Sequence, residues 1–196
     1  MPNAVAIIPA RFDSTRFPGK PLSNLNGKVL IQHVYEHASD AKLVDYVLVA
    51  TDDRRIFDAV TAFGGRVVMT SGSHESGTDR IAEAAADIEC EVVVNVQGDE
   101  PFIRPDMIDD VVGLLYNDKK ASISALAKKI TDNDELVSHN VVKVVVDNEG
   151  FALYFSRSPV PYYRDDWMGP GDIAYTADDM VIFKHIGIYG YRKRDL

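Results

Sequence analysis

The chain has 196 residues, of which 46% are hydrophobic and 26% charged, a composition that suits one domain with a sizeable core and excludes an intrinsically disordered chain. Its formal net charge of −9 argues against non-specific binding to nucleic acid or to an anionic membrane surface, and no run of about 18 apolar residues predicts a membrane span. The single cysteine cannot form an internal disulfide, and the first residues lack the cationic start of a secretion signal, so we expect a reducing cytoplasm.

The first expected strand, residues 5–8, is a continuous apolar run that ends in a loop rich in proline. In this loop Arg11, Arg16 and Lys20 supply three positive charges against the one carboxylate of Asp13. The loop contains neither G-x-G-x-x-G nor G-x-x-x-x-G-K-[ST], so it is not a dinucleotide fingerprint or a Walker loop. A stiff cationic loop after a buried strand predicts a polyphosphate receptor, although a solvated basic loop would have the same composition.

Strands and helices alternate through the next hundred residues. The apolar spacing predicts, in chain order, a helix at 29–38, a strand at 44–50, a helix that Asp52 or Asp53 caps and Gly64-Gly65 ends, a strand at 66–69, a helix at about 78–88, a strand at 92–96 and a helix from Pro105. Such alternation predicts the α/β class, with a doubly wound, mostly parallel sheet.

The last third of the chain has a different pattern. It predicts a strand at 123–130, a short helix at 131–137, a β-hairpin of residues 141–146 and 151–155, and a final strand at 186–191. Residues 157–180 are rich in proline and acids and are expected to form an excursion or a partner-contacting loop.

Ligands of doubly wound sheets bind at the carboxyl ends of the strands, so the loops there hold the candidate chemistry. Asp99 and Glu100 follow the most apolar strand, where carboxylates can hold Mg²⁺ beside substrate phosphates or simply cap a turn. The segment 76–80 could offer donors to a nucleobase or a phosphate, or could be only a capping box. His74 has no His or Cys partner at ligand spacing, and no nucleophilic triad is visible. The aromatic strand after His185 could pack the sheet or face a sugar.

Several segments together resemble a known family. Ala6-Ile7-Ile8-Pro9-Ala10-Arg11 and Phe17-Pro18-Gly19-Lys20-Pro21-Leu22 are similar to the signature of the sugar-acid cytidylyltransferases. Four further segments resemble the branch of that family that uses 3-deoxy-manno-octulosonate (Kdo), namely 76–80, 95–101, 152–157 and 185–191. The matching segments are collinear and span nearly the whole chain, which makes the resemblance specific.

The resemblance implies a nucleotide-diphospho-sugar transferase-like fold in a single domain, 1–196, with a β-hairpin and dimerisation excursion. Residues 1–130 would form the nucleotide-binding part and residues 131–196 the part for sugar binding and dimer contacts. It also implies a homodimer that joins CTP and Kdo to give CMP-Kdo and pyrophosphate, with Mg²⁺, for lipopolysaccharide assembly.

The same resemblance implies roles for individual residues. Arg11, Lys20 and Asp99 would be catalytic, with Asp99 also the metal ligand. The nucleotide would be bound by the Ala10 backbone, Arg11, Ser14, Lys20, Thr78, Arg80 and Gln97. The sugar acid would be bound by Glu100, Arg157, His185 and Tyr189.

The chain also departs from the pattern of its relatives. Phe17 stands where leucine is usual, and Ser138-His139-Asn140 replaces a segment with a central proline. Relatives continue past the position of Leu196 with a segment that carries a second metal-binding aspartate, so we expect the chain as given to be truncated or impaired. The alternatives are a cytidylyltransferase for another sugar acid, such as 8-amino-Kdo or a sialic acid, and a non-catalytic nucleotide-binding module.

Overall fold

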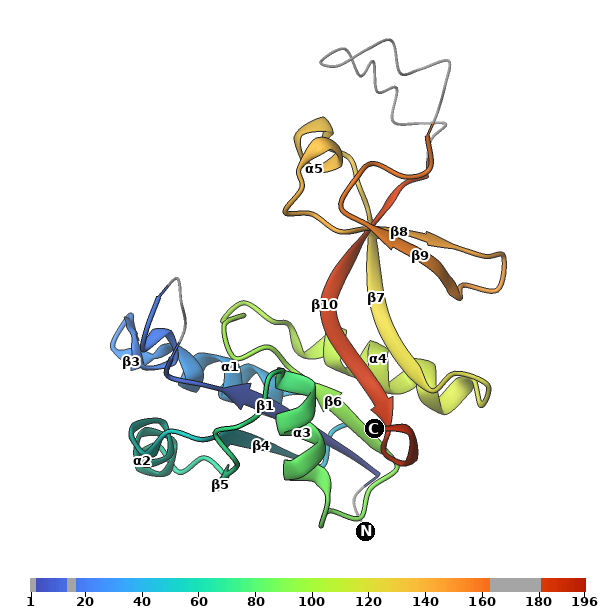
Figure 1. Ribbon diagram of the computed structural model, residues 1–196. Coiled ribbons are helices and arrows are strands. Elements are labelled where there is room, and N and C mark those ends of the chain that lie inside the picture. The colour runs from blue at the N-terminus through green and yellow to red at the C-terminus, as the bar shows by residue number, and fades with distance from the viewer. Residues whose placement is uncertain (1–2, 14–16, 163–180) are drawn as a thin grey trace. The chain divides into compact units, whose positions relative to one another are not determined.

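The computed structural model describes residues 3–13, 17–162 and 181–196 and shows the expected α/β architecture (Figure 1). Its centre is β1 (Ala4–Ala10), an almost fully buried strand. On its two sides lie β4 (Tyr46–Thr51) and β6 (Val92–Asn95), both parallel to β1. A strand with apolar residues on both faces is stable only where helices cover both faces, as they do here.

The chain forms two compact units, and the larger comprises Met1–Ala125 and Ile188–Leu196. Its strand order is β5-β4-β1-β6-β10, with β5 (Val67–Met69) at the edge. β10 (Phe183–Arg192) runs antiparallel to β6, so the sheet is mostly rather than wholly parallel. The fold class predicted from the sequence is therefore confirmed.

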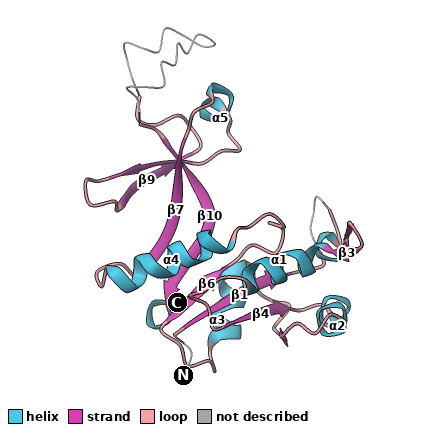
Figure 2. Cartoon of the chain, turned by 180° about the vertical axis from the view of Figure 1, so that it is seen from behind, coloured by secondary structure: helices cyan, strands magenta, loops and turns pink. Residues whose placement is uncertain are grey.

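Helices cover both faces of this sheet. α3 (Gly77–Ala85) lies in front of the strands in Figure 1, whereas α1 (Leu30–Ser39) and α4 (Pro105–Asn117) lie in front in the reverse view of Figure 2. α2 (Arg54–Ala62) packs near β5 and is capped by Asp53, whose side chain accepts the backbone N–H of Arg55. The predicted cap of this helix is confirmed. No helix among the described residues is long and apolar enough to span a membrane.

Three short elements between β1 and α1 were not predicted from the sequence. They are the 3-10 helix η1 (Lys20–Leu22) and the strands β2 (Asn24–Leu25) and β3 (Lys28–Val29), which form a small hairpin. Its turn, Asn26-Gly27, has positive φ angles of 51° and 86°, the geometry that an Asn-Gly hairpin favours.

The smaller unit comprises Leu126–Gly187. Within it, β8 (Lys143–Val146) pairs antiparallel with β9 (Ala152–Ser156), which confirms the predicted hairpin. The N-terminal end of β10 pairs with β8, and β10 begins three residues earlier than predicted. The unit also contains α5 (Asn133–Val137) and part of β7 (Ile123–Lys129). Most of the predicted excursion at 157–180 lies outside the described residues.

Candidate functional site

The loops predicted to carry chemistry meet at one edge of the larger unit's sheet. Ala10 at the end of β1 is the register partner of Thr51 at the end of β4, and Ile7 pairs with Asn95 at the end of β6. The loops that follow these three strands therefore start side by side. The first turn of α3 reaches the same edge, because a Cβ atom on Gly77 would lie 3.4 Å from the ring of Pro9.

Lys20 and Asp99 form an ion pair that joins two of these loops. The Lys20 Nζ atom lies 2.8 Å from Asp99 Oδ2, and the side chains keep 36% and 55% of their surface exposed. Such an exposed pair contributes only about 0–1 kcal/mol to stability. Its consequence is positional: a cation of the predicted phosphate loop and the predicted metal ligand face each other, and both remain accessible.

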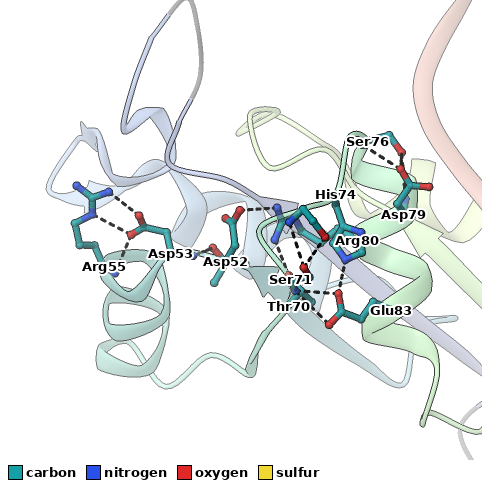
Figure 3. Close-up of polar contacts among 12 residues, drawn as sticks. Asp52, Asp53, Arg55, Thr70, Ser71, His74, Ser76, Asp79, Arg80 and Glu83 are labelled. Atoms are coloured by element: carbon teal, nitrogen blue, oxygen red, sulfur yellow. Dashed lines mark hydrogen bonds and ion pairs between the residues drawn. The ribbon is translucent and has the colours of Figure 1, made fainter.

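The cationic loop is anchored through Phe12. The guanidinium of Arg55 lies 3.3 Å from the centre of the Phe12 ring, and its Nε and Nη2 atoms donate to Asp53 (Figure 3). These hydrogen bonds lower the pKa of Asp53. The Gly19 N–H donates to the Phe12 carbonyl at 2.8 Å, which closes the loop. Arg11 is exposed just after β1, whereas Ser14 lies outside the described residues.

The loop that carries Asp99 lies directly against β1. A Cβ atom on Gly98 would lie 2.9 Å from the carbonyl oxygen of Pro9, so a side chain there would collide with backbone. The neighbouring Gln97 donates a long hydrogen bond of 3.4 Å to Asn95. Tyr189 on β10 is the register partner of Asn95, and burial, followed by the neighbouring Tyr191, raises the pKa of its phenol. Gln97 and Tyr189 are thus both neighbours of Asn95.

Asp99 is an exposed carboxylate of the kind that Mg²⁺ binds. Among the described residues no three His, Cys, Asp or Glu side chains are grouped to hold a metal. Glu100 is exposed and adjacent in sequence, and its N–H donates to the Gln97 carbonyl at 3.2 Å. A single exposed carboxylate can hold Mg²⁺ where phosphate oxygens and water supply the other ligands.

Arg80 is buried in the first turn of α3, with 4% of its surface exposed. Its Nη1 atom donates to Thr70 Oγ1 at 2.6 Å and its Nη2 atom to Asp52 at 2.9 Å (Figure 3). A buried guanidinium requires such partners, because its desolvation is costly. Ser76 and Asp79 form a capping box, which was one of the two interpretations of this segment. Thr78 lies between them in the first turn of α3 and is half-buried.

A contact between His74 and Glu83 was not predicted. The His74 Nε2 atom is hydrogen-bonded to Glu83, which also accepts the Ser71 N–H at 3.0 Å and whose pKa the His74 contact lowers. Nothing in the sequence marks this pair, because the two residues lie on opposite sides of the α3 N-terminus. The contact holds the loop that precedes α3.

Two of the predicted sugar-binding residues belong to the smaller unit. The Arg157 Nη1 atom donates to the His139 carbonyl at 2.7 Å. His185 packs edge-on against Phe155, with 5.2 Å between ring centres, and burial lowers its pKa. A further residue, Lys143, was missed. Its ammonium is buried and hydrogen-bonded to three backbone carbonyls, and a lysine flanked by valines in the sequence was the available signal.

Comparison with known proteins shows extensive similarity. A family model described as Cytidylyltransferase matches residues 5–196. A 3-deoxy-manno-octulosonate cytidylyltransferase from Geobacter metallireducens is 53% identical over 188 residues, which cover 96% of this chain and 74% of that protein. Its counterpart from Geobacter sulfurreducens is 52% identical over 191 residues, covering 97% of this chain and 76% of that protein. A solved structure of CMP:2-keto-3-deoxy-manno-octonic acid synthetase complexed with CTP matches with a TM-score of 0.88 at 43% identity, over 98% of this chain and 75% of that one.

Proposed function

This chain belongs to the cytidylyltransferase family, and we propose on that basis that it joins CTP and Kdo to give CMP-Kdo and pyrophosphate. The observation that carries the proposal is the 53% identity to a Kdo cytidylyltransferase over 96% of the chain. The Lys20–Asp99 pair, 2.8 Å apart and contributed by the segments that follow two central strands, supplies a matching arrangement of charges.

The reaction is a phosphoryl-centre substitution. The anomeric hydroxyl oxygen of Kdo forms a bond to the α-phosphorus of CTP, and the bond from that phosphorus to the bridging oxygen of the β-phosphate breaks. Pyrophosphate leaves with the electron pair, and the hydroxyl proton passes to solvent. Such transfers depend on positioning and charge neutralisation rather than on covalent chemistry by the protein.

Arg11 and Lys20 are proposed to bind the triphosphate, with Ser14 and the Ala10 backbone beside it. Lys20 is paired with Asp99, but an exposed ion pair is worth only about 0–1 kcal/mol, so an incoming phosphate can replace it at small cost. Asp99 is proposed to hold Mg²⁺, which when bound neutralises phosphate charge. The accessible carboxylate supports this assignment.

The remaining proposed roles concern the binding of the cytidine part of CTP and the binding of Kdo. Thr78, Arg80 and Gln97 are proposed to contact the cytidine part of CTP, and Glu100, Arg157, His185 and Tyr189 to contact Kdo. For Arg157, the contact with His139 uses one of five guanidinium N–H donors. A guanidinium can therefore also take a carboxylate in the usual two-pronged way.

The proposal also includes a homodimer in a reducing cytoplasm that supplies CMP-Kdo for lipopolysaccharide assembly. The described residues of the smaller unit include large apolar side chains open to solvent, with Leu153 65%, Tyr154 61% and Phe155 47% exposed on β9. Large apolar side chains that are exposed on the same strand are often part of a contact surface. Light scattering coupled to gel filtration measures the mass directly, and a monomer at all concentrations would argue against the dimer.

A pyrophosphate-release assay tests the proposed function. The chain is incubated with CTP, Mg²⁺ and either Kdo, 8-amino-Kdo or a sialic acid, and release is expected with Kdo. Preference for one of the other acids would reassign the substrate. CTP binding in a calorimeter without release from any acid would favour a non-catalytic nucleotide-binding module instead.

A further inference from the structure

The side chain of Lys143 is fully buried, with 0% of the residue exposed. Its Nζ atom donates to the backbone carbonyls of Ser138, Val141 and Arg157, each at 2.8 Å. All three ammonium donors are thus used, which is what burial of this group requires. Burial lowers the pKa of Lys143, and the positive charge of Arg157 adds to the effect.

The contacts of this ammonium converge on Arg157. Lys143 holds the carbonyl of Arg157 and also both ends of the turn 138–141. The Arg157 guanidinium donates at 2.7 Å to the His139 carbonyl, which lies inside that turn. The main chain of Arg157 and the acceptor of its side chain are therefore fixed by one and the same ammonium.

A second residue of the proposed sugar site is tied to the same strand end. The His185 N–H donates at 2.8 Å to the carbonyl of Val142, the residue before Lys143. His185 also packs on Phe155 of the neighbouring strand β9. Arg157 and His185 are the two residues of the smaller unit that are assigned to Kdo. Arg157 is thus bound by Lys143 itself, and His185 by the residue next to Lys143.

Burial of a lysine side chain carries a free-energy cost, because its charged ammonium loses contact with water. An apolar side chain of similar length would fill the same volume without desolvating a charge. The cost is offset where the ammonium fixes groups that an apolar side chain cannot, here three carbonyls from two separate segments. It also places a second positive charge near Arg157, which favours an anionic ligand.

We propose that Lys143 is a positioning residue of the sugar-acid site, holding Arg157 and the turn 138–141 in the arrangement that receives the carboxylate of the sugar acid. This inference rests on the proposed function, in which Arg157 binds that carboxylate. Lys143 acts through Arg157 and does not itself touch the substrate.

The test compares Lys143→Met with the matched control Lys184→Met. Lys184 lies opposite Lys143 on β10, but its side chain pairs with Glu135. The Lys184→Met substitution therefore removes a lysine from the same sheet and leaves the contacts of the turn 138–141 and of Arg157 in place. In the pyrophosphate-release assay, Lys143→Met is expected to raise the KM for Kdo by about tenfold or more and to leave the KM for CTP within about twofold. Lys184→Met is expected to leave both values near those of the unmodified chain.

A double variant separates positioning from general stability. In an Arg157→Ala background, Lys143→Met should produce little further loss of Kdo affinity, because the residue through which it acts is absent. Full additivity, or an unchanged Kdo KM in Lys143→Met, would overturn the inference. If Lys143→Met does not fold, Lys143→Gln, which keeps amide donors, takes its place with a smaller expected rise. An unmodified chain that releases no pyrophosphate with Kdo refutes the proposed function instead, and that result is distinguishable from the others.

Discussion

Replacing Gly98 with alanine places a methyl group 2.9 Å from the carbonyl oxygen of Pro9. The neighbours offer little relief, because the same methyl group would lie 3.4 Å from Ile8 Cγ2 and 3.5 Å from Ile31 Cδ1, both on fully buried residues. Pro9 cannot retreat easily either, since it is the register partner of Ala50 in the neighbouring strand β4. Relief therefore requires the loop that carries Asp99 to move away from β1.

The magnitude follows from two opposing effects. Overpacking costs about 1–3 kcal/mol, whereas alanine recovers about 0.4–1 kcal/mol by restricting the unfolded chain. The expected net loss is about 1–2 kcal/mol, which for a chain of this size lowers the Tm by roughly 2–8 °C. Turnover of CTP should fall as well, because Asp99 moves with the loop.

Calorimetric melting and the pyrophosphate-release assay measure the two effects. Gly113→Ala is the matched control, since a methyl group there meets only Leu43, at 4.0 Å, and lies inside α4. Alanine is favoured over glycine in a helix by about 1 kcal/mol, so this control should melt no lower than the unmodified chain. A Gly98→Ala chain with unchanged Tm and unchanged turnover would refute the close-approach argument.

Three further predictions follow from the site. Asp99→Asn should abolish Mg²⁺-dependent turnover with a melting curve close to that of the unmodified chain; surviving activity would remove Asp99 from the metal role. Lys20→Ala should weaken CTP binding by about 2 kcal/mol, or roughly 30-fold, for one lost charge-assisted bond, and calorimetry at constant ionic strength would contradict this by showing equal affinity. Because burial lowers the pKa of His185, the unfolded chain binds more protons near and below its ordinary pKa of about 6.5, so stability should fall as the pH falls through that value. His185→Gln should reduce this dependence of the free energy of unfolding on pH, measured by urea titrations at a series of pH values. An unchanged dependence would show that His185 is not the group responsible.

Much of the larger unit could be predicted because its signals are local. Continuous apolar runs mark β1 and β6, and Ser76 with Asp79 marks the start of α3. The antiparallel pairing of β10 with β6 could not be predicted, because Tyr189 and Asn95 are far apart in the sequence and periodicity identifies a strand but not its neighbour.

The site itself was predicted unevenly. The meeting of Lys20 with Asp99 follows from the topology, since parallel strands deliver their loops to one edge. The buried contacts of Arg80 depend on residues from two separate loops, and those of Lys143 depend on a turn and a strand end, so neither set could be derived from spacing. The Asn26-Gly27 hairpin, by contrast, had a recognisable signal and was missed.

The most direct test of the central claim is a phosphorus NMR time course of the chain with CTP, Mg²⁺ and Kdo. We expect the three CTP resonances to be replaced by one phosphodiester resonance and the resonance of pyrophosphate in equal molar amounts, only when Kdo is present. CTP that stays intact, or that yields CMP and pyrophosphate without a sugar phosphodiester, would contradict it.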